Sequence, residues 1–350
     1  MSKIAILGHG VVGSGTAEVF LKNKESIIKK TGQSVDIKYI LDLRDVSEFG
    51  ECEYADKFTK DFEVILNDDE VTVVAELIGG ITPAYDYVKA LLLSGKSIVT
   101  SNKELVAKKG AELFKIAKDK NVSFFFEASV GGGIPIIRTL NQCLAADKIN
   151  EVAGILNGTT NFILTKMSRD NMGFEEALRL AQDNGYAERD PSDDINGTDA
   201  CRKICILASM VFGKRVNPDK VFTEGITSLT KEDIAFCESN GGTVKLIARA
   251  IKDNDKVSVS VCPAFVDKNS QLAGVNDVYN AILVRGEATG DVVFYGKGAG
   301  KYPTASAVVN DIVNALNNSG NTLSWGDEEQ EITPPEFSKT CGNIRFFDNI

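Results

Sequence analysis

Residues 4–13 read IAILGHGVVG, a run of four apolar residues followed by a six-residue segment with glycine at positions 8, 10 and 13. The apolar run predicts a buried strand, and the residues after Gly13 have the periodicity of a helix. In such a unit Gly8 allows a tight turn, Gly10 lets a ligand approach the backbone, and Gly13 lets helix and strand pack closely. The helix N-terminus favours a phosphate group. The stretch therefore predicts a dinucleotide-binding fold that begins at the first strand.

Short apolar runs alternate with helical segments through the first third of the chain. We predict strands at 3–7, 35–41, 71–78, 97–100 and 122–127, and helices at 13–30, 84–94 and 103–119. This alternation is typical of a parallel sheet with helices on both faces.

The pattern changes after Gly133. Here we predict helices at 134–145, 174–183, 198–212 and 242–252, strands at 150–156 and 256–262, and one more apolar helix at 304–316. We therefore expect an α/β protein with three parts. They are a Rossmann domain over 1–133 with a returning helix at 301–317, an α+β catalytic and dimerisation domain over 134–300, and a polar, loosely structured tail over 318–350.

The bulk composition excludes several classes of protein. The 350 residues carry a net charge of −10, and Lys and Arg are scattered, so the chain has no basic footprint for nucleic acid. Seven cysteines without a CxxC pair indicate reduced thiols. The chain starts without a secretory signal and has no apolar run near the ~20 residues that span a bilayer. We expect a cytoplasmic protein.

His9, inside the glycine loop, is the only histidine. Its position excludes Ser-His-Asp hydrolysis, Cys-His proteolysis and catalysis by a His-ligated metal. Any proton transfer must use Lys, Asp, Glu, Tyr or water.

The most acidic stretch, residues 185–203, reads GYAERDPSDDINGTDACRK. We predict an irregular loop up to a helix starting at Thr198, with Thr198 or Asn196 as its cap. Asp199 and Lys203 stand four apart on one helix face. Carboxylates that can hold an ammonium group, next to a lysine that can exchange a proton, predict a receptor for an amino-acid substrate. The alternative is a solvated loop with a surface ion pair, which contributes only about 0–1 kcal/mol.

The residues expected to contact the cofactor pyrophosphate are Gly8, Gly10, Val11, Val12 and Gly13. The strand at 35–41 leads into Asp42, which can bind ribose hydroxyls as NAD requires, and into Arg44, which can pair with the 2′-phosphate of NADP. The sequence leaves this choice open. Lys103 follows the strand at 97–100, at the sheet edge where such folds bind ligands.

Six motifs in order resemble those of the homoserine dehydrogenases, over roughly residues 3–316. They are GHGVVG, TSNKE, EASVGGGIPI, ILNGTTNFIL, the acidic stretch, and YGKGAGKYPTASAVVNDI. The resemblance implies reversible, NAD(P)H-dependent reduction of L-aspartate 4-semialdehyde to L-homoserine, a step toward threonine, methionine and isoleucine. The alternative is a non-catalytic NAD(P)-binding sensor on the same fold.

The resemblance also implies roles for single residues. Lys203 is the proton donor, Lys103 the second lysine of the site and a cofactor contact, and Asp199 supports Lys203. The residues that bind the substrate are Glu188, Asp194, Tyr186 and Thr159. Those that hold a structural sodium ion are Glu127, Val130, Gly132 and Ile134, and Gly298 and Gly300 return to the cofactor.

Three expectations concern the whole molecule. The family suggests a homodimer. The polar tail is too short for the regulatory ACT domain of about 80 residues that many members carry, so we expect none in this chain. We also expect no fused aspartate kinase, because the sequence begins at the Rossmann strand.

Overall fold

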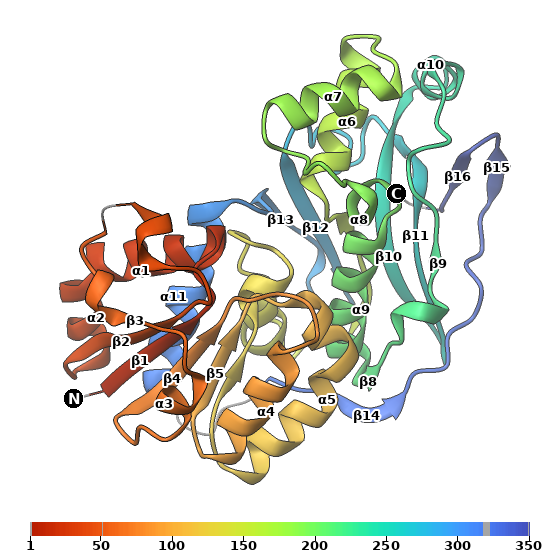
Figure 1. Ribbon diagram of the computed structural model, residues 1–350. Coiled ribbons are helices and arrows are strands. Elements are labelled where there is room, and N and C mark those ends of the chain that lie inside the picture. The colour runs from red at the N-terminus through yellow and green to blue at the C-terminus, as the bar shows by residue number, and fades with distance from the viewer. Residues whose placement is uncertain (1, 51, 318–322, 349) are drawn as a thin grey trace. The chain divides into compact units, whose positions relative to one another are not determined.

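The protein is described by a computed structural model that covers residues 2–50, 52–317, 323–348 and 350. The chain folds into two compact units (Figure 1). Unit 1 comprises residues 1–133 and 299–327, and unit 2 comprises residues 134–298 and 328–350. The chain thus passes from one unit to the other three times. Among the described residues no helix is both long and apolar enough to cross a bilayer.

Unit 1 contains a six-stranded parallel sheet in the order β3-β2-β1-β4-β5-β6. The strands are β1 (Ser2–Leu7), β2 (Val35–Leu41), β3 (Phe58–Thr59), β4 (Val71–Glu76), β5 (Ser97–Thr100) and β6 (Phe124–Phe125). This order is that of a doubly wound dinucleotide-binding fold, in which the ligand lies at the carboxyl ends of the strands where the order reverses, here between β1 and β4. The fold class predicted for the N-terminal part is confirmed.

Helices cover both faces of this sheet (Figure 1). They are α1 (Val11–Lys22), α2 (Lys24–Thr31), α3 (Phe62–Leu66), α4 (Ala84–Leu93), α5 (Lys103–Asp119) and α11 (Lys301–Asn317). Short 3₁₀ turns lie at Val46–Phe49, Ala55–Lys57 and Glu127–Ser129. The segment predicted to be helical over 13–30 is helical but is divided into α1 and α2, because Asn23 leaves helical geometry and its side-chain amide donates to the carbonyl of Val19.

The last helix, α11, is an integral part of unit 1. It packs against α1 and against β4 and β5. Gly15 of α1 has no room for a side chain, since a Cβ there would lie 3.0 Å from the carbonyl oxygen of Lys301. Asp311 of α11 accepts a hydrogen bond from the backbone N–H of Glu127 at 2.8 Å. Sequence positions nearly 200 residues apart therefore share one core.

Unit 2 is built on a mixed sheet in the order β13-β12-β7-β10-β11-β16-β15, with β9 also paired to β11. The strands are β7 (Ile149–Ile155), β9 (Phe222–Thr223), β10 (Gly242–Asp253), β11 (Lys256–Asp267), β12 (Tyr279–Gly286), β13 (Gly290–Lys297), β15 (Lys339–Cys341) and β16 (Ile344–Phe346). The central pairs are antiparallel, whereas β16 and β9 run parallel to β11. A separate two-stranded sheet joins β8 (Lys214–Arg215) and β14 (Gly326–Glu329).

Five α-helices accompany the sheet of unit 2 in the described part of the chain. They are α6 (Gly158–Arg169), α7 (Phe174–Asp183), α8 (Ser192–Ile195), α9 (Thr198–Phe212) and α10 (Lys231–Ser239). A π-helical turn lies at Thr139–Cys143 and a 3₁₀ turn at Pro218–Lys220. The apolar helix α9 packs against β7, β10 and β11, which places its buried side chains beside the sheet.

Three sequence predictions for this half are wrong. Residues 242–252 form the central strand β10 instead of a helix, because burial on both faces removes the alternation that marks a strand. The helix predicted over 134–145 is reduced to the π-helical turn at 139–143. The tail predicted as loosely structured contributes β14, β15 and β16, while its residues 318–322 and 349 lie outside the described residues.

The tail is ordered because it covers apolar side chains of the sheet. Phe347 and Ile350 belong to a buried cluster with Ile155, Ile247 and Leu283, and Phe337 packs against its edge. Burying such side chains contributes roughly 25 cal/mol per Å² of apolar surface removed from water. A polar sequence with a few aromatic residues at the right positions is therefore enough to hold the segment on the sheet.

Candidate functional site

The glycine loop of unit 1 leaves space where a phosphate group would approach. Gly8 has a φ of +93°, and a Cβ there would lie 2.9 Å from the carbonyl oxygen of Leu77. A Cβ on Gly13 would lie 2.0 Å from the carbonyl oxygen of Gly8, so both glycines are required by the fold itself. Gly10 has no atom within 4 Å of its Cβ position and is the residue before α1, whose first residues are Val11 and Val12. The open backbone and the helix N-terminus together fit a pyrophosphate.

Both candidate ribose ligands lie together at the end of β2. The carboxylate of Asp42 accepts hydrogen bonds from the backbone N–H of His9 at 2.8 Å and from the backbone and guanidinium of Arg44. These bonds, with those from Arg44 the strongest, hold the pKa of Asp42 well below its usual range. Arg44 also lies over the ring of Phe49, 4.7 Å from its centre.

His9 is a packing residue of this loop. Its Nε2 lies 3.1 Å from the hydroxyl of Tyr54, and its ring meets those of Phe49, Tyr54 and Phe58 edge-on. Burial lowers the pKa of His9 below 6.5, so the ring is neutral at pH 7.

Two residues that the sequence analysis missed fix the neighbouring loop. Glu76, at the end of β4, is fully buried and accepts hydrogen bonds from the N–H groups of Ile78 and Gly79 and from the hydroxyl of Thr100. Burial raises the pKa of Glu76. Asn102 caps α5 and donates to the carbonyl of Gly80 at 2.6 Å. The only signal in the sequence was a polar residue at the end of each apolar strand.

Lys103 is the first residue of α5, directly after this cap. It belongs to unit 1, and Lys203 belongs to unit 2. Gly298 is the last residue of the first segment of unit 2, and a Cβ there would lie 1.9 Å from the side-chain amide of Asn280. Gly300 has a φ of +121° just before α11.

The centre of the candidate site in unit 2 is a buried ion pair on α9. The Nζ of Lys203 lies 2.8 Å from Oδ2 of Asp199 and donates to the carbonyl oxygen of Leu156 at 2.9 Å. Lys203 is 7% exposed and Asp199 4%, so the surface ion pair considered from the sequence is excluded. Burying two charges costs several kcal/mol per ion, and replacing such a pair by apolar residues is often neutral or stabilising. A functional reason for this pair is therefore favoured.

Asn157 joins this pair to a second carboxylate, and the sequence analysis missed it. Its Nδ2 donates to Oδ1 of Asp194 at 2.6 Å and to Oδ2 of Asp199 at 2.9 Å. Asp194 lies on the short helix α8, in the segment predicted to be irregular. Burial, together with the negative charge of Asp199, raises the pKa of Asp194. The residues that could hold an ammonium group and those that could move a proton thus form one network.

The other predicted substrate ligands lie around this network. The hydroxyl of Thr159 donates to the carbonyl oxygen of Tyr186 at 2.7 Å, and the Tyr186 ring packs edge-on against Phe162. Tyr186 is 45% exposed, and Glu188 is exposed in the same loop. Lys203 and Asp199 are therefore in direct contact and Asp194 is joined to them through Asn157, whereas Glu188 stands apart from these hydrogen bonds.

The predicted cap of α9 is wrong. Neither Thr198 nor Asn196 caps the helix; the residue before it is Gly197, in the left-handed conformation with a φ of +82°. A Cβ on Gly197 would lie 3.2 Å from Thr223 and 3.3 Å from Val261. Close packing against β9 and β11 decides this position, and local capping chemistry does not.

Three of the four residues predicted to hold sodium lie at the end of the first segment of unit 1. Glu127, Val130 and Gly132 are buried there, and Ile134 is the first residue of unit 2. In the part of the chain that the structure describes, no group of three or more His, Cys, Asp or Glu side chains forms a ligand set for a metal. Any cation here would need backbone oxygens.

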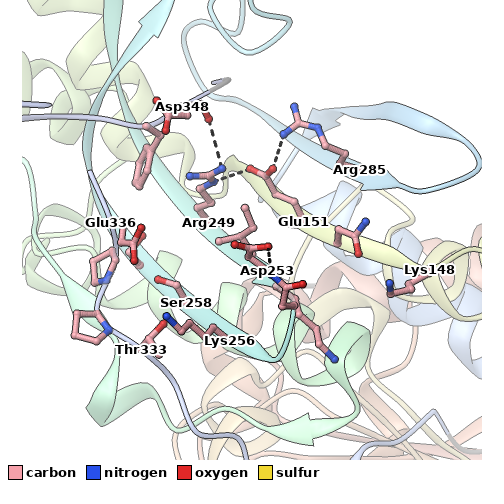
Figure 2. A pocket seen from close by; sticks show the side chains of 18 of the residues that line it. Lys148, Glu151, Arg249, Asp253, Lys256, Ser258, Arg285, Thr333, Glu336 and Asp348 are labelled. Carbon is pink, nitrogen blue, oxygen red and sulfur yellow. Dashed lines mark hydrogen bonds and ion pairs between the residues drawn. The ribbon is translucent and has the colours of Figure 1, made fainter. Parts of the chain in front are cut away.

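A polar cavity of about 640 Å³ lies elsewhere in unit 2 (Figure 2). Glu151 occupies its centre and pairs with both Arg249, at 2.6 Å, and Arg285. Thr333 to Glu336 and Phe347 of the tail form one wall. None of the predicted site residues lines it, and its arginines are already paired, since Arg285 also binds Asp291 at 2.7 Å.

Comparisons with known proteins show to which family the chain belongs. Residues 8–127 match the family model for the homoserine dehydrogenase NAD binding domain, and residues 135–313 match that for homoserine dehydrogenase. The homoserine dehydrogenase of Bacillus subtilis is 40% identical over 339 residues, which cover 95% of this chain and 78% of that protein. The one from Neisseria gonorrhoeae is 42% identical, over 89% of this chain and 71% of that protein.

Solved structures show the same likeness. The crystal structure of a homoserine dehydrogenase from Thiobacillus denitrificans superposes with a TM-score of 0.86 at 39% identity, over 90% of this chain and 73% of that one. A hyperthermophilic archaeal homoserine dehydrogenase mutant in complex with NADPH gives a TM-score of 0.76 at 28% identity, over 90% and 97%. The chain belongs to the homoserine dehydrogenase family of NAD(P)-dependent oxidoreductases.

Proposed function

We propose that Lys203 is the proton-transfer residue in the reversible reduction of L-aspartate 4-semialdehyde to L-homoserine. The observation that carries this proposal is the buried Lys203–Asp199 pair, which Asn157 connects to Asp194. A bound nicotinamide supplies or accepts the hydride. Reduction of an aldehyde leaves negative charge on its oxygen, which needs a cation beside it and then a proton.

Lys203 meets both needs. Its ammonium group is held by Asp199 and by the carbonyl oxygen of Leu156, so that Nζ has a fixed direction. An ammonium carries three protons, and these two contacts leave a third for the substrate oxygen. In the reverse direction the neutral amine accepts the proton of the homoserine hydroxyl.

Asp194 and Glu188 would bind the α-ammonium group of the substrate. Burial raises the pKa of Asp194, and an arriving ammonium group would favour its ionised form. Tyr186 and Thr159, linked by a hydrogen bond, would line the same side. Lys103 would contact the substrate and the nicotinamide, since it follows the carboxyl end of β5.

The cofactor would lie on the glycine loop of unit 1. Gly10, Val11 and Val12 would face the pyrophosphate, while Gly8 and Gly13 shape the turn. Asp42 would serve NAD and Arg44 would serve NADP; the archaeal relative whose structure contains NADPH supports use of the second. Gly298 and Gly300 would approach the cofactor from the other end of the chain.

Several finer features complete the proposal. The enzyme would act in threonine, methionine and isoleucine synthesis, in the cytoplasm, as a homodimer. Glu127, Val130, Gly132 and Ile134 would hold a sodium ion, several of them through backbone oxygens, which suit a hard cation. The domain limits would be 1–133 with 301–317 for the cofactor and 134–300 for the substrate, followed by a polar segment from 318 to 350. A purely cofactor-binding sensor is not favoured, because both lysines and all the carboxylates are present.

The test is the absorbance change at 340 nm with L-homoserine and either NAD or NADP at about pH 9, for the wild type and Lys203→Met. We expect turnover in the wild type and a loss of at least a hundredfold in the variant. Turnover that survives in the variant would move the proton donor to another group. Absence of turnover in a folded wild type that binds NADH would favour the sensor.

A further inference from the structure

The side chain of Asn157 is fixed in one orientation. Asn157 lies between β7 and α6 and is 5% exposed. Its Oδ1 accepts hydrogen bonds from the backbone N–H of Thr160 at 2.8 Å and from the Thr160 hydroxyl at 3.0 Å. A backbone N–H can only donate, so the atom facing it must be the amide oxygen. The NH₂ group must then point the other way, toward Asp194 and Asp199.

That NH₂ group bridges two carboxylates that are far away in the sequence. It donates one hydrogen bond to Asp194, 37 residues away, and one to Asp199, 42 residues away. The oxygen of Asp199 that receives it, Oδ2, is also the one that faces Nζ of Lys203. Leu156, next to Asn157, accepts a hydrogen bond from the same ammonium group. One dipeptide therefore touches both members of the ion pair.

Helix capping alone does not explain an asparagine here. Asn, Asp and Ser cap helices about equally well, and all three can accept the bond from Thr160. Only an amide of this length can accept that hydrogen bond and also donate two hydrogen bonds to carboxylates. The bridge between the two carboxylates therefore requires asparagine at this position, whereas the helix cap does not.

We infer that Asn157 is a positioning residue that couples the ammonium-binding carboxylate Asp194 to proton transfer at Lys203. This inference rests on the roles proposed above for Asp194 and Lys203. The amide takes up part of the negative charge on Oδ2 of Asp199, so Asp199 holds the proton of Lys203 less tightly. It also fixes the distance between two like charges that would otherwise repel each other.

The test is the pH dependence of kcat for homoserine oxidation, from pH 6 to 10, in Asn157→Ser and Asn157→Asp. Both variants keep a capping oxygen and lose the NH₂ donor. Without that donor Asp199 holds the Lys203 proton more tightly, so the pH of half-maximal kcat should rise by about one unit in Asn157→Ser. The kcat near pH 7 would then fall about tenfold, with little change at pH 10. Asn157→Asp adds a negative charge, and its shift should be larger. In both variants the KM for homoserine should rise, because Asp194 loses its partner.

Two further variants complete the test. Thr160→Val keeps the NH₂ bridge and should show the wild-type profile. In Lys203→Met the fall of kcat toward low pH should disappear altogether. If the fall of kcat toward low pH disappears in Lys203→Met while Asn157→Ser keeps the wild-type midpoint, the role of Lys203 stands and the inference about Asn157 is wrong. If Lys203→Met still shows the fall of kcat toward low pH, the proposed proton donor is wrong, and the inference about Asn157 is wrong as well. A uniform loss of kcat at all pH values, with a lower melting temperature, would reduce Asn157 to a helix cap.

Discussion

Arg44 and Asp42 form a two-point contact at the end of β2. Nε of Arg44 lies 3.0 Å from Oδ1 of Asp42, and its terminal nitrogen lies 2.8 Å from Oδ2. The guanidinium thus occupies both oxygens that would otherwise be offered to ribose hydroxyls. Since Arg44 is half exposed whereas Asp42 is largely buried, Arg44 is the member of the pair that can turn toward a ligand.

The first prediction concerns cofactor choice. In Asp42→Ala, Arg44 loses its partner and a negative charge beside the 2′ position disappears, so the ratio of kcat/KM for NADP to that for NAD should rise. Arg44→Ala should lower the ratio. Charge-assisted hydrogen bonds contribute about 1.5–3 kcal/mol, which corresponds to changes of roughly ten- to a hundredfold. Arg44→Lys, which keeps the charge but not the two-point geometry, is the control. An unchanged ratio in both alanine variants would place the ribose elsewhere.

The second prediction concerns His9 and stability in acid. Burial lowers the pKa of His9 below the unfolded value of 6.5, so the fold disfavours the charged ring. Its contribution is present above pH 6.5 and is lost as the pH falls through the folded pKa. His9→Phe keeps an aromatic ring in the cluster with Phe49 and Phe58 but has no proton site. Its free energy of unfolding should fall less than that of the wild type between pH 7.5 and 5. Denaturant unfolding of both proteins at the two pH values measures this. An equal change in the free energy of unfolding in the wild type and in His9→Phe would contradict it.

The third prediction concerns Lys245, a 2% exposed lysine of β10. Its Nζ donates to the carbonyl of Val275 at 2.5 Å and to the side-chain oxygens of Asn161 and Asn276 at 3.2 Å. Lys245→Met leaves these oxygens without that donor and should lower the free energy of unfolding by about 2–4 kcal/mol. Lys256→Met, at an exposed position, should change it by less than about 0.5 kcal/mol.

The same lysine should make this loss depend on pH. Burial lowers the pKa of Lys245 from 10.5 to about 8, so the folded state favours the neutral amine. The wild type should therefore gain stability relative to Lys245→Met as the pH rises from 8 toward 10.5, by up to roughly 3 kcal/mol. Urea unfolding at pH 7.5 and 10 measures the gap between the two proteins. A constant gap would mean that the lysine stays charged throughout this range.

The fourth prediction concerns the tail. Phe347 is 8% exposed, and its ring lies 4.9 Å from the guanidinium of Arg249 and 5.3 Å from Phe337. Phe347→Ala should cost about 3–5 kcal/mol, as for other buried aromatic residues, and should make the tail sensitive to brief proteolysis. Phe337→Ala, at a partly buried position, should cost less. Release of the tail without any loss of stability would show that it is not part of the core of unit 2.

The sequence predicted best where the signal was local. The glycine loop and the alternation of short apolar runs with helices were enough for the parallel sheet of unit 1, because each strand and helix has its own periodicity. β10 was predicted as a helix because Val244, Leu246, Ile247, Ala248 and Ala250 are all apolar, and a strand buried on both faces has no alternation. The length and composition of this segment alone do not distinguish a buried strand from a helix.

The site was predicted in part for the same reason. Asp199 and Lys203 stand four apart on one helix, so their pairing follows from the spacing. Asn157 has no such signal, because its partners lie 37 and 42 residues away and only the folded chain brings them together. Glu76 is similar: its ligands include Thr100 on the neighbouring strand. The predicted cap of α9, Thr198 or Asn196, is wrong because packing of Gly197 against Val261 overrides local preference.

The discontinuity of unit 1 affects the order in which the protein can fold during synthesis. Residues 2–125 supply all the strands of its sheet, but α11, which packs against α1, β4 and β5, leaves the ribosome only after the whole of residues 134–298. At roughly 5–20 residues per second, the nascent Rossmann sheet stays without this helix for about ten seconds or more. During that time the surface around Gly15 and the N–H of Glu127 lacks its final neighbours. Unit 2 can begin to form its own strands first, so the cofactor-binding unit, although encoded first, is completed late.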